Sequence, residues 1–153
     1  MPSLDVVYAT PSPEAAGRKP AVANLVLDLT ERLLGKARAP TAVTVTEVAA
    51  GDWFVGGASL ADLGRASHRT IVRVTEGTNT KAEKARWIAA VHEGMERLLG
   101  PMRPESYAIV EEVRADAWGW GGETQERRAI AAMLAGEAEA SLVFEAYRRH
   151  GVR

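Results

Sequence analysis

Apolar and polar residues along the 153-residue chain recur with two different periods. Short runs rich in β-branched residues at 4–8, 42–48, 70–74 and 107–113 predict four strands. Apolar residues spaced by three and four positions predict a helix after the first strand and another after the third. The first stripe comprises Val22, Leu25, Val26, Leu29 and Leu33, and the weaker second one Trp87, Ala90, Val91, Gly94 and Leu98. Gly35 and Gly100 are placed to cap these helices, with Pro40 and Pro101 just beyond.

The two halves of this pattern are related by a displacement of 65 residues. The segment Glu31-Arg32-Leu33-Leu34-Gly35 recurs as Glu96-Arg97-Leu98-Leu99-Gly100, and Trp53-x-x-Gly56-Gly57 recurs as Trp118-x-x-Gly121-Gly122. Thirteen of the 27 positions from 31 to 57 are identical without a gap, where residue frequencies would give roughly two. The sequence therefore indicates a duplicated unit.

Each unit is a strand, a helix and a second strand, and a right-handed crossover makes its two strands parallel. Two such units side by side predict an α+β fold in which tandem β-α-β units form a four-stranded sheet with both helices on one face. Apolar side chains on the other face then need cover, so we expect a closed oligomer.

These units set the predicted domain boundaries. Residues 2–122 form one duplicated domain, with units at 2–57 and 67–122 joined by a link at 58–69. Residues 123–153 form a C-terminal helical extension, since 124–149 favours helix and matches neither unit.

Composition narrows the chemistry. With 19 basic and 20 acidic residues the net charge is -1, so we expect neither a nucleic-acid nor a membrane partner. The absence of cysteine and the presence of only three histidines argue against a metal site, and no cofactor is expected. No apolar run reaches the roughly 20 residues of a spanning helix, and the first residues do not read as a signal peptide, which favours a cytoplasmic protein.

The motif at the end of the second strand of each unit suggests a family. Thr46-Glu47-Val48-Ala49 leads to Trp53-Phe54-Val55-Gly56-Gly57, and Pro2 directly follows the initiator Met1. Over residues 2–122 the chain resembles the tautomerase superfamily, each half being similar to 4-oxalocrotonate tautomerase. Two-unit chains of this superfamily include macrophage migration inhibitory factor and cis-3-chloroacrylic acid dehalogenase. The resemblance implies a homotrimer.

The resemblance implies that Pro2 is catalytic once Met1 is removed. A terminal amine titrates near 7.7 to 8.0, and burial lowers that value, which leaves a neutral general base near pH 7. Proline also restricts φ, which holds the base in a defined direction.

Further site residues follow from the similarity to two-unit chains. Lys36 is implied to hold a substrate carboxylate or the developing enolate oxygen, and Tyr107 to donate a hydrogen bond to it. Trp118 and Trp120 are implied to form an apolar wall of the substrate site. Each residue also has a simpler explanation. Lys36 can be a charge at the end of a helix, Tyr107 an ordinary strand residue, and the two tryptophans core or interface packing.

The chain also departs from the family pattern. The single-unit enzymes carry an arginine after Glu-Gly, where this chain has Thr78 after Glu76-Gly77, and the residues of the cis-dehalogenase are missing. Arg73 is the candidate that we assign to substrate binding, although Arg73, Arg38 and Arg103 are also explained as paired surface charges.

The leading hypothesis is a cofactor-free tautomerase that uses Pro2 as general base on a small carbonyl or carboxylate substrate. The alternatives are a hydratase or decarboxylase with protonated Pro2 as acid, and a non-catalytic trimeric scaffold. Only one site per chain is expected, because Ser67-His68 stands where the first unit has Pro2 and has no free amine. His68 and His92 are expected at the surface or in the link.

Overall fold

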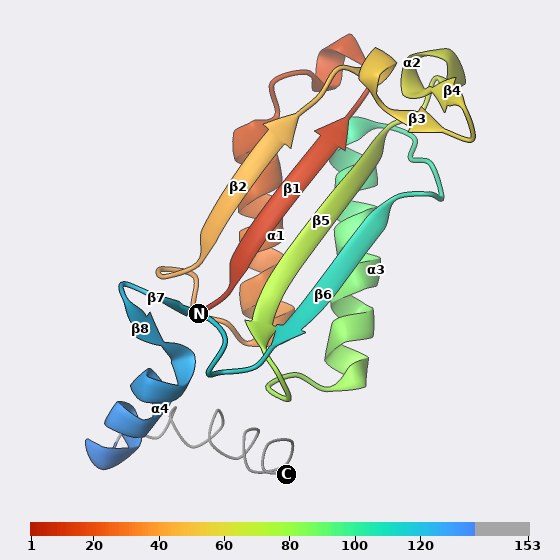
Figure 1. Ribbon diagram of the computed structural model, residues 1–153. Coiled ribbons are helices and arrows are strands. Elements are labelled where there is room, and N and C mark those ends of the chain that lie inside the picture. The colour runs from red at the N-terminus through yellow and green to blue at the C-terminus, as the bar shows by residue number, and fades with distance from the viewer. Residues whose placement is uncertain (137–153) are drawn as a thin grey trace.

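The structure is a computed structural model that describes residues 1–136. A single four-stranded sheet has the order β2-β1-β5-β6 (Figure 1). Its strands are β1 (Ser3–Ala9), β2 (Ala42–Glu47), β5 (Ser67–Thr75) and β6 (Tyr107–Val113). The β1–β2 and β5–β6 pairs are parallel, and the central β1–β5 pair is antiparallel. The predicted α+β fold with two β-α-β units is confirmed.

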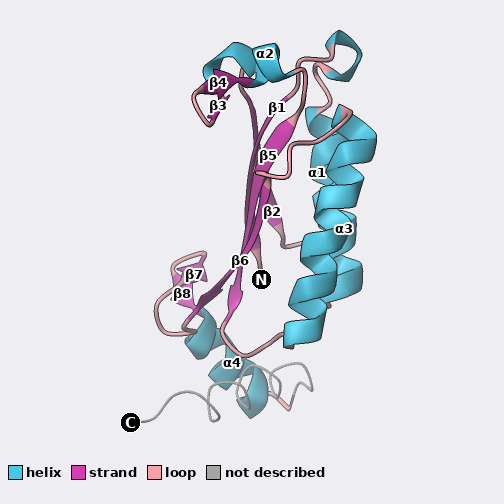
Figure 2. Ribbon diagram, turned by 90° about the vertical axis from the view of Figure 1, so that its right-hand side faces the viewer, coloured by secondary structure: helices cyan, strands magenta, loops and turns pink. Residues whose placement is uncertain are grey.

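Two long helices, α1 (Lys19–Leu34) and α3 (Lys81–Leu99), cover the same face of the sheet (Figure 2). The core lies between them and the sheet, and it includes Leu4, Val6, Tyr8, Val72, Val74, Val22, Val26, Trp87, Val91 and Met95. The indole of Trp87 is fully buried and donates a hydrogen bond of 3.1 Å to the hydroxyl of Thr30, which joins the two helices. The predicted apolar stripes are therefore the faces that the helices bury.

The segment after each parallel pair repeats as well. In the first unit a short 3-10 helix (Ala50–Asp52) precedes β3 (Phe54–Val55), β4 (Ala58–Ser59) and the single-turn helix α2 (Leu60–Leu63). In the second unit β7 (Gly119–Trp120), β8 (Glu123–Thr124) and α4 (Gln125–Leu134) follow at the same displacement of 65 residues. The hydroxyls of Ser59 and Thr124 cap their helices in the same way, each accepting from a backbone amide three residues on.

These elements extend the duplication beyond the predicted units. The β7–β8 hairpin spans the boundary placed at residue 122, and the expected link 58–69 contains β4, α2 and the start of β5. The described part of the C-terminal extension is helical in α4, which is longer than its counterpart α2. Residues 137–153, including the rest of the helix-favouring run, lie outside the described residues.

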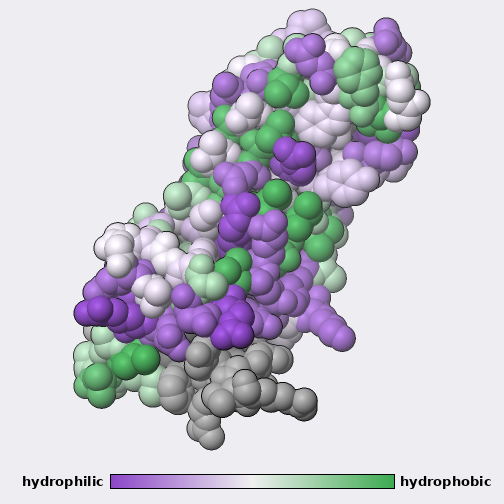
Figure 3. Space-filling model, viewed as in Figure 1, coloured by the Kyte–Doolittle hydropathy of each residue, from purple (hydrophilic) through white to green (hydrophobic). Residues whose placement is uncertain are grey.

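The second face of the sheet carries no helix in the described part of the chain (Figure 2). Val7, Ile71 and Ile109 lie on it together with polar residues, and Figure 3 shows apolar and polar groups intermixed over this face. The register puts Ile71 directly beside Ile109 on the neighbouring strand. We call this surface the open face.

Two negative findings concern the same residues 1–136. None of their helices combines the length and apolar character that crossing a membrane requires. None of their histidine, aspartate and glutamate side chains form a group of three or more able to hold a metal ion.

Candidate functional site

A cavity of about 1030 Å³ opens at the end of the sheet where β1 begins and β5 ends. Pro2 is buried and lines it, and Met1 lines it as well. The remaining wall residues come from the end of α1, the β5–α3 turn and the β7–β8–α4 segment: Leu34, Gly35, Lys36, Ala37, Pro40, Val74, Thr75, Thr78, Asn79, Thr80, Glu83, Trp120, Glu123, Gln125, Arg128, Ala131, Ala132 and Ala135.

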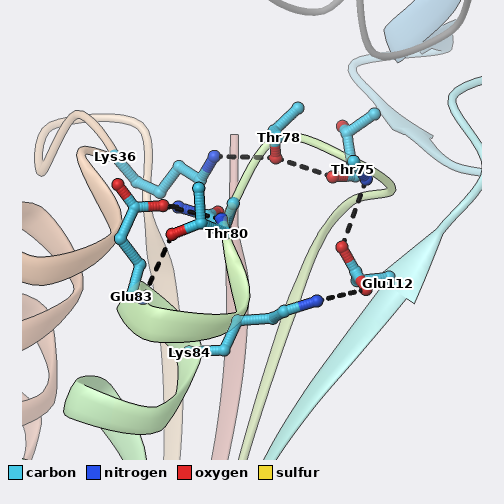
Figure 4. A network of polar contacts seen from close by, with 9 residues as sticks. Lys36, Thr75, Thr78, Thr80, Glu83, Lys84 and Glu112 are labelled. Carbon is cyan, nitrogen blue, oxygen red and sulfur yellow. Dashed lines mark hydrogen bonds and ion pairs between the residues drawn. The ribbon is translucent and has the colours of Figure 1, made fainter. Parts of the chain in front are cut away.

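Lys36 reaches the cavity because of how α1 ends. Gly35 adopts the left-handed conformation (φ 64°), and its amide donates back to the carbonyl of Glu31. The Lys36 ammonium donates a hydrogen bond of 2.9 Å to the Thr78 hydroxyl, which in turn donates one of 2.6 Å to the carbonyl of Thr75 (Figure 4). Burial lowers the pKa of Lys36, while Glu83 and Glu112 act in the opposite direction.

The start of α3 is fastened beside this lysine. Thr80 and Glu83 form a reciprocal capping box, in which the Glu83 carboxylate accepts from the Thr80 amide at 2.8 Å (Figure 4). The side-chain amide of Asn79 donates to the carbonyl of Leu34 at 2.9 Å and so ties the end of α1 to the start of α3. These contacts hold the lysine side of the cavity in place.

The chain terminus lies inside this cavity. Burial lowers the pKa of the Met1 amine, and the charges of Lys36 and Arg128 lower it further. The Pro2 nitrogen lies one residue, about 3.5 Å, further along the chain than this amine. A terminal amine at this end of β1 is therefore shifted toward its neutral form.

Trp120 and Arg128 form the opposite wall. The Arg128 guanidinium lies 3.8 Å from the centroid of the Trp120 ring and donates a hydrogen bond of 2.9 Å to the Trp120 carbonyl. The indole remains 43% exposed, so one part of the ring is open to a ligand. Sequence reasoning missed Arg128, although comparison of the units beyond residue 122 would have singled it out, since the first unit has Leu63 at that position.

The fold brings together only some of the predicted site residues. Pro2, Lys36 and Trp120 line the cavity. Tyr107 begins β6 at the opposite end of the sheet, where it pairs with Arg69 and is 58% exposed. Arg69 to Arg73 alone spans about 13 Å along β5, so Tyr107 does not reach Pro2 of its own chain.

Trp118 and Arg73 also lie outside the cavity wall. Trp118 is half-buried, and its carbonyl accepts from the amide of Gln125 at 3.0 Å, as Trp53 does from Leu60 in the first unit. Arg73 lies on the open face, where it forms ion pairs of 2.5 Å with Asp5 and 2.8 Å with Glu111.

The second unit has no equivalent of the terminal amine. Ala66 precedes β5 and is held on both sides, because its amide donates to the carbonyl of Pro101 at 2.9 Å and its carbonyl accepts from the amide of Arg103 at 2.8 Å.

His68 is fully buried on the face of the sheet that packs against the helices, so the prediction that it lies at the surface or in the link was wrong. Its neighbour His92 is partly buried, and their ring centroids are 6.0 Å apart.

Comparisons with known proteins agree with this geometry. Residues 71–128 match the model of the Tautomerase enzyme family. No curated protein matches the sequence. Among solved structures, a fused 4-OT described as a wild-type symmetric trimer has a TM-score of 0.65 at 22% identity, with 80% of this chain and 95% of that chain covered.

Two other solved structures have the same fold. The crystal structure of Pt0534 inactivated by 2-oxo-3-pentynoate has a TM-score of 0.68 at 16% identity and covers 82% of this chain and 98% of its own. A macrophage migration inhibitory factor-like protein from Entamoeba histolytica has a TM-score of 0.63 at 16% identity, covering 80% and 97%. The family match over the second unit and the shared fold confirm the predicted resemblance of this chain to the tautomerase superfamily.

Proposed function

We propose that this protein is a cofactor-free tautomerase whose Pro2 amine, freed by removal of Met1, is the general base. In the direction of enolisation, the amine takes a proton from the carbon next to a carbonyl of a small oxo acid or related compound. The protonated amine then returns this proton to the oxygen, or to another carbon, of the resulting enolate, and ketonisation is the reverse. The observation that carries the proposal is that the chain terminus lies in this cavity, where burial and the charges of Lys36 and Arg128 lower the pKa of the Met1 amine.

The same observation favours a base over an acid. An ordinary terminal amine is mostly protonated near pH 7, and a group that is to accept a proton must first be neutral. Since all three influences on the amine disfavour its charged form, the terminus is suited to proton abstraction. The alternative hydratase or decarboxylase mechanism needs the protonated amine, which this site disfavours.

Lys36 is proposed to stabilise the enolate that forms when the proton leaves. Its ammonium is anchored on the Thr78 hydroxyl, and an ammonium has three donors, so others remain for a substrate oxygen. A fixed cation in a partly buried cavity stabilises developing negative charge more strongly than one in water. Trp120 is proposed to form an apolar wall beside the amine and to limit the access of water.

Tyr107 takes part only if another copy of the chain supplies it. The open face carries Val7, Ile71 and Ile109 with no helix over it in the described residues, and the solved fused 4-OT is described as a trimer. We therefore propose a homotrimer in which copies cover each other's open faces. In this arrangement the exposed Tyr107 of one copy is available to a neighbour, whereas it cannot serve its own Pro2.

The test combines intact mass with kinetics. We expect the purified protein to lack Met1. We also expect it to ketonise the enol form of phenylpyruvate, or 2-hydroxymuconate. Replacement of Pro2 by alanine exchanges a rigid secondary amine for a more flexible primary one and should lower kcat/KM by about 10-fold or more. Pro104→Ala, at an exposed position in the loop before β6, is the matched control and should leave the rate unchanged.

Two results would contradict the proposal. The first is a fully active protein that retains Met1. Its Pro2 nitrogen would be an amide, and an amide nitrogen has no basic lone pair. Equal rates for the wild type and Pro2→Ala would remove Pro2 from the mechanism.

A further inference from the structure

Arg128 is held in the cavity wall with most of its hydrogen-bonding capacity unused. A guanidinium has five N–H donors, and among the described residues Arg128 makes one hydrogen bond, from Nη2 to the Trp120 carbonyl. Its Nε is buried and has no partner within residues 1–136. Because this Nε has almost no accessible surface, a ligand would be held by the terminal nitrogens of the guanidinium, whose side chain is 30% exposed.

Among the described residues, Glu123 forms an ion pair with Arg128, and this pair is loose. Glu123 lies 3.7 Å from Nη2, beyond hydrogen-bond distance, and the same side chain also faces Arg127 at 3.6 Å. Exposed pairs of this kind contribute little. Within residues 1–136 the charge of Arg128 is therefore only loosely paired.

The cavity wall carries Lys36 as a second cation, beside the carboxylates of Glu83 and Glu123. Lys36 and the terminal amine face the same space, and the amine senses the charge of Arg128. The carboxylate of Glu83 is occupied by the Thr80 and Asn79 groups that it accepts from. The donors of Lys36 and Arg128 that face this space are not used by Glu83, and a planar carboxylate on a ligand matches the fork of an arginine.

The arginine at position 128 has no counterpart in the first unit. At the same displacement the first unit has Leu63, at the end of a single helical turn. In α4 the helix continues, and Arg128, Ala131, Ala132 and Ala135 recur with helical spacing along the cavity wall. The small side chains leave room beside the guanidinium for the rest of a ligand.

We propose that Arg128 is the substrate-binding residue that holds the carboxylate of an anionic oxo acid, while Lys36 serves the enolate oxygen. The inference deepens the proposed tautomerase function and rests on it. It adds a preference for substrates with a free carboxylate. The residue that gives this preference lies in α4, the helix that follows β7 and β8.

The experiment compares an acid with its uncharged ester. Phenylpyruvate and its methyl ester are assayed with the wild type, Arg128→Met, Arg128→Lys and the matched control Arg127→Met, whose side chain is 77% exposed on the same helix. For Arg128→Met we expect kcat/KM to fall about 10- to 100-fold for the acid, the value of hydrogen bonds to a charged group, and little for the ester. Arg128→Lys should recover part of the acid preference, and Arg127→Met should keep all of it.

Equal losses for acid and ester would overturn the inference, since they would mean that Arg128 acts only by supporting Trp120. Equal effects of Arg127→Met and Arg128→Met would overturn it too. They would mean that any positive charge on α4 has the same effect, without a specific contact from Arg128. Glu123→Gln keeps Arg128 and removes its nearest carboxylate, so it should bind the acid at least as tightly as the wild type. A weaker affinity for the acid in this variant would count against the inference.

A binding measurement separates this inference from the proposed function. Titration calorimetry with 3-phenylpropionate and its amide needs no turnover. If the wild type lacks tautomerase activity but prefers the carboxylate, and Arg128→Met abolishes that preference, the proposed reaction fails and the binding role of Arg128 stands. If the active wild type shows no preference, the role of Arg128 fails alone.

Discussion

Single residues act on one another through charge at the amine end of the sheet. The terminal amine, Lys36 and Arg128 share one cavity, and each cation makes a further positive charge less favourable. The Thr78 hydroxyl holds Lys36 at 2.9 Å, so the position of this charge is defined. The protonation of the amine is therefore set by two neighbours as well as by burial.

Replacement of Lys36 by methionine should raise the pKa of the terminal amine, because one of the two cations that lower it is removed. If the neutral amine is the base, kcat/KM rises with pH through this pKa, and the midpoint of the rise moves to higher pH in the variant. A pH profile of phenylpyruvate ketonisation measures the midpoint separately from any loss of rate. Lys19→Met, at an exposed position, is the control, and an unchanged midpoint in Lys36→Met would refute the expected coupling.

His68 shows a second effect of burial on a titratable group. Its ring is fully buried, Nδ1 lies 3.0 Å from the Thr70 hydroxyl, and Nε2 has no partner among the described residues. Burial, with a smaller contribution from His92, lowers the pKa of His68 to about 4. The folded protein therefore holds this histidine neutral, whereas the unfolded chain protonates it near pH 6.5.

Acid should consequently destabilise the fold through His68. Stability from this group is complete above pH 6.5 and is lost as the pH falls toward 4, on the order of 3 kcal/mol in total. Urea unfolding between pH 7.5 and 4.5 should show a smaller decline for His68→Asn, whose amide oxygen can replace Nδ1 as acceptor. A variant as acid-sensitive as the wild type would assign the decline to other groups.

At the scale of elements, α1 and α3 approach each other closely at Gly94. A Cβ added there would lie 2.7 Å from both terminal methyl groups of Leu25, so alanine requires that leucine to move. At the displacement of 65 residues, Gly94 of α3 corresponds to Leu29 of α1. The duplicated helices therefore pack asymmetrically, with the larger residue on α1.

We expect Gly94→Ala to destabilise the protein by about 1 kcal/mol, since the packing conflict outweighs the better helix propensity of alanine. In the Leu25→Ala background the conflict is absent, and the same substitution should be neutral or stabilising. A double-mutant cycle of thermal unfolding measures the difference. Additive effects of the two changes would show that Leu25 does not set the cost.

At the scale of the whole molecule, the open face determines how copies of the chain assemble. Ile71 lies in the central antiparallel pair and has Ile109 beside it, on a surface that also holds the Asp5–Arg73–Glu111 ion pairs. An apolar patch next to fixed charges suits a specific contact between copies. The proposed homotrimer would bury this region.

Ile71→Glu should therefore prevent assembly, because a carboxylate would be desolvated at the interface. Sedimentation analysis should give three chain masses for the wild type and one for the variant. Ile88→Glu is the matched control: its side chain is 40% exposed on α3, on the helical side of the sheet, and the trimer should persist. Assembly of Ile71→Glu as in the wild type would exclude this face from the interface.

The sequence by itself determined the secondary structure and its duplication. Strand and helix periods are local properties of the chain, and the gap-free displacement of 65 residues relates one β-α-β unit to the other. Pro2, Lys36 and Trp120 were predicted for the site by resemblance, and the fold gathers them around one cavity. Gly35 contributed to this outcome, because a left-handed residue after α1 sets where the chain, and so Lys36, continues.

Only the tertiary structure decided which distant residues meet. The antiparallel β1–β5 pair puts the starts of β1 and β6 at opposite ends of the sheet, so Tyr107 and Pro2 lie apart within one chain. The path after β6 returns α4 to the amine and brings Arg128 into the wall, whereas Arg73 faces away with its own carboxylates. Local periodicity shows which face of an element is buried, but strand direction and register determine which elements share an end.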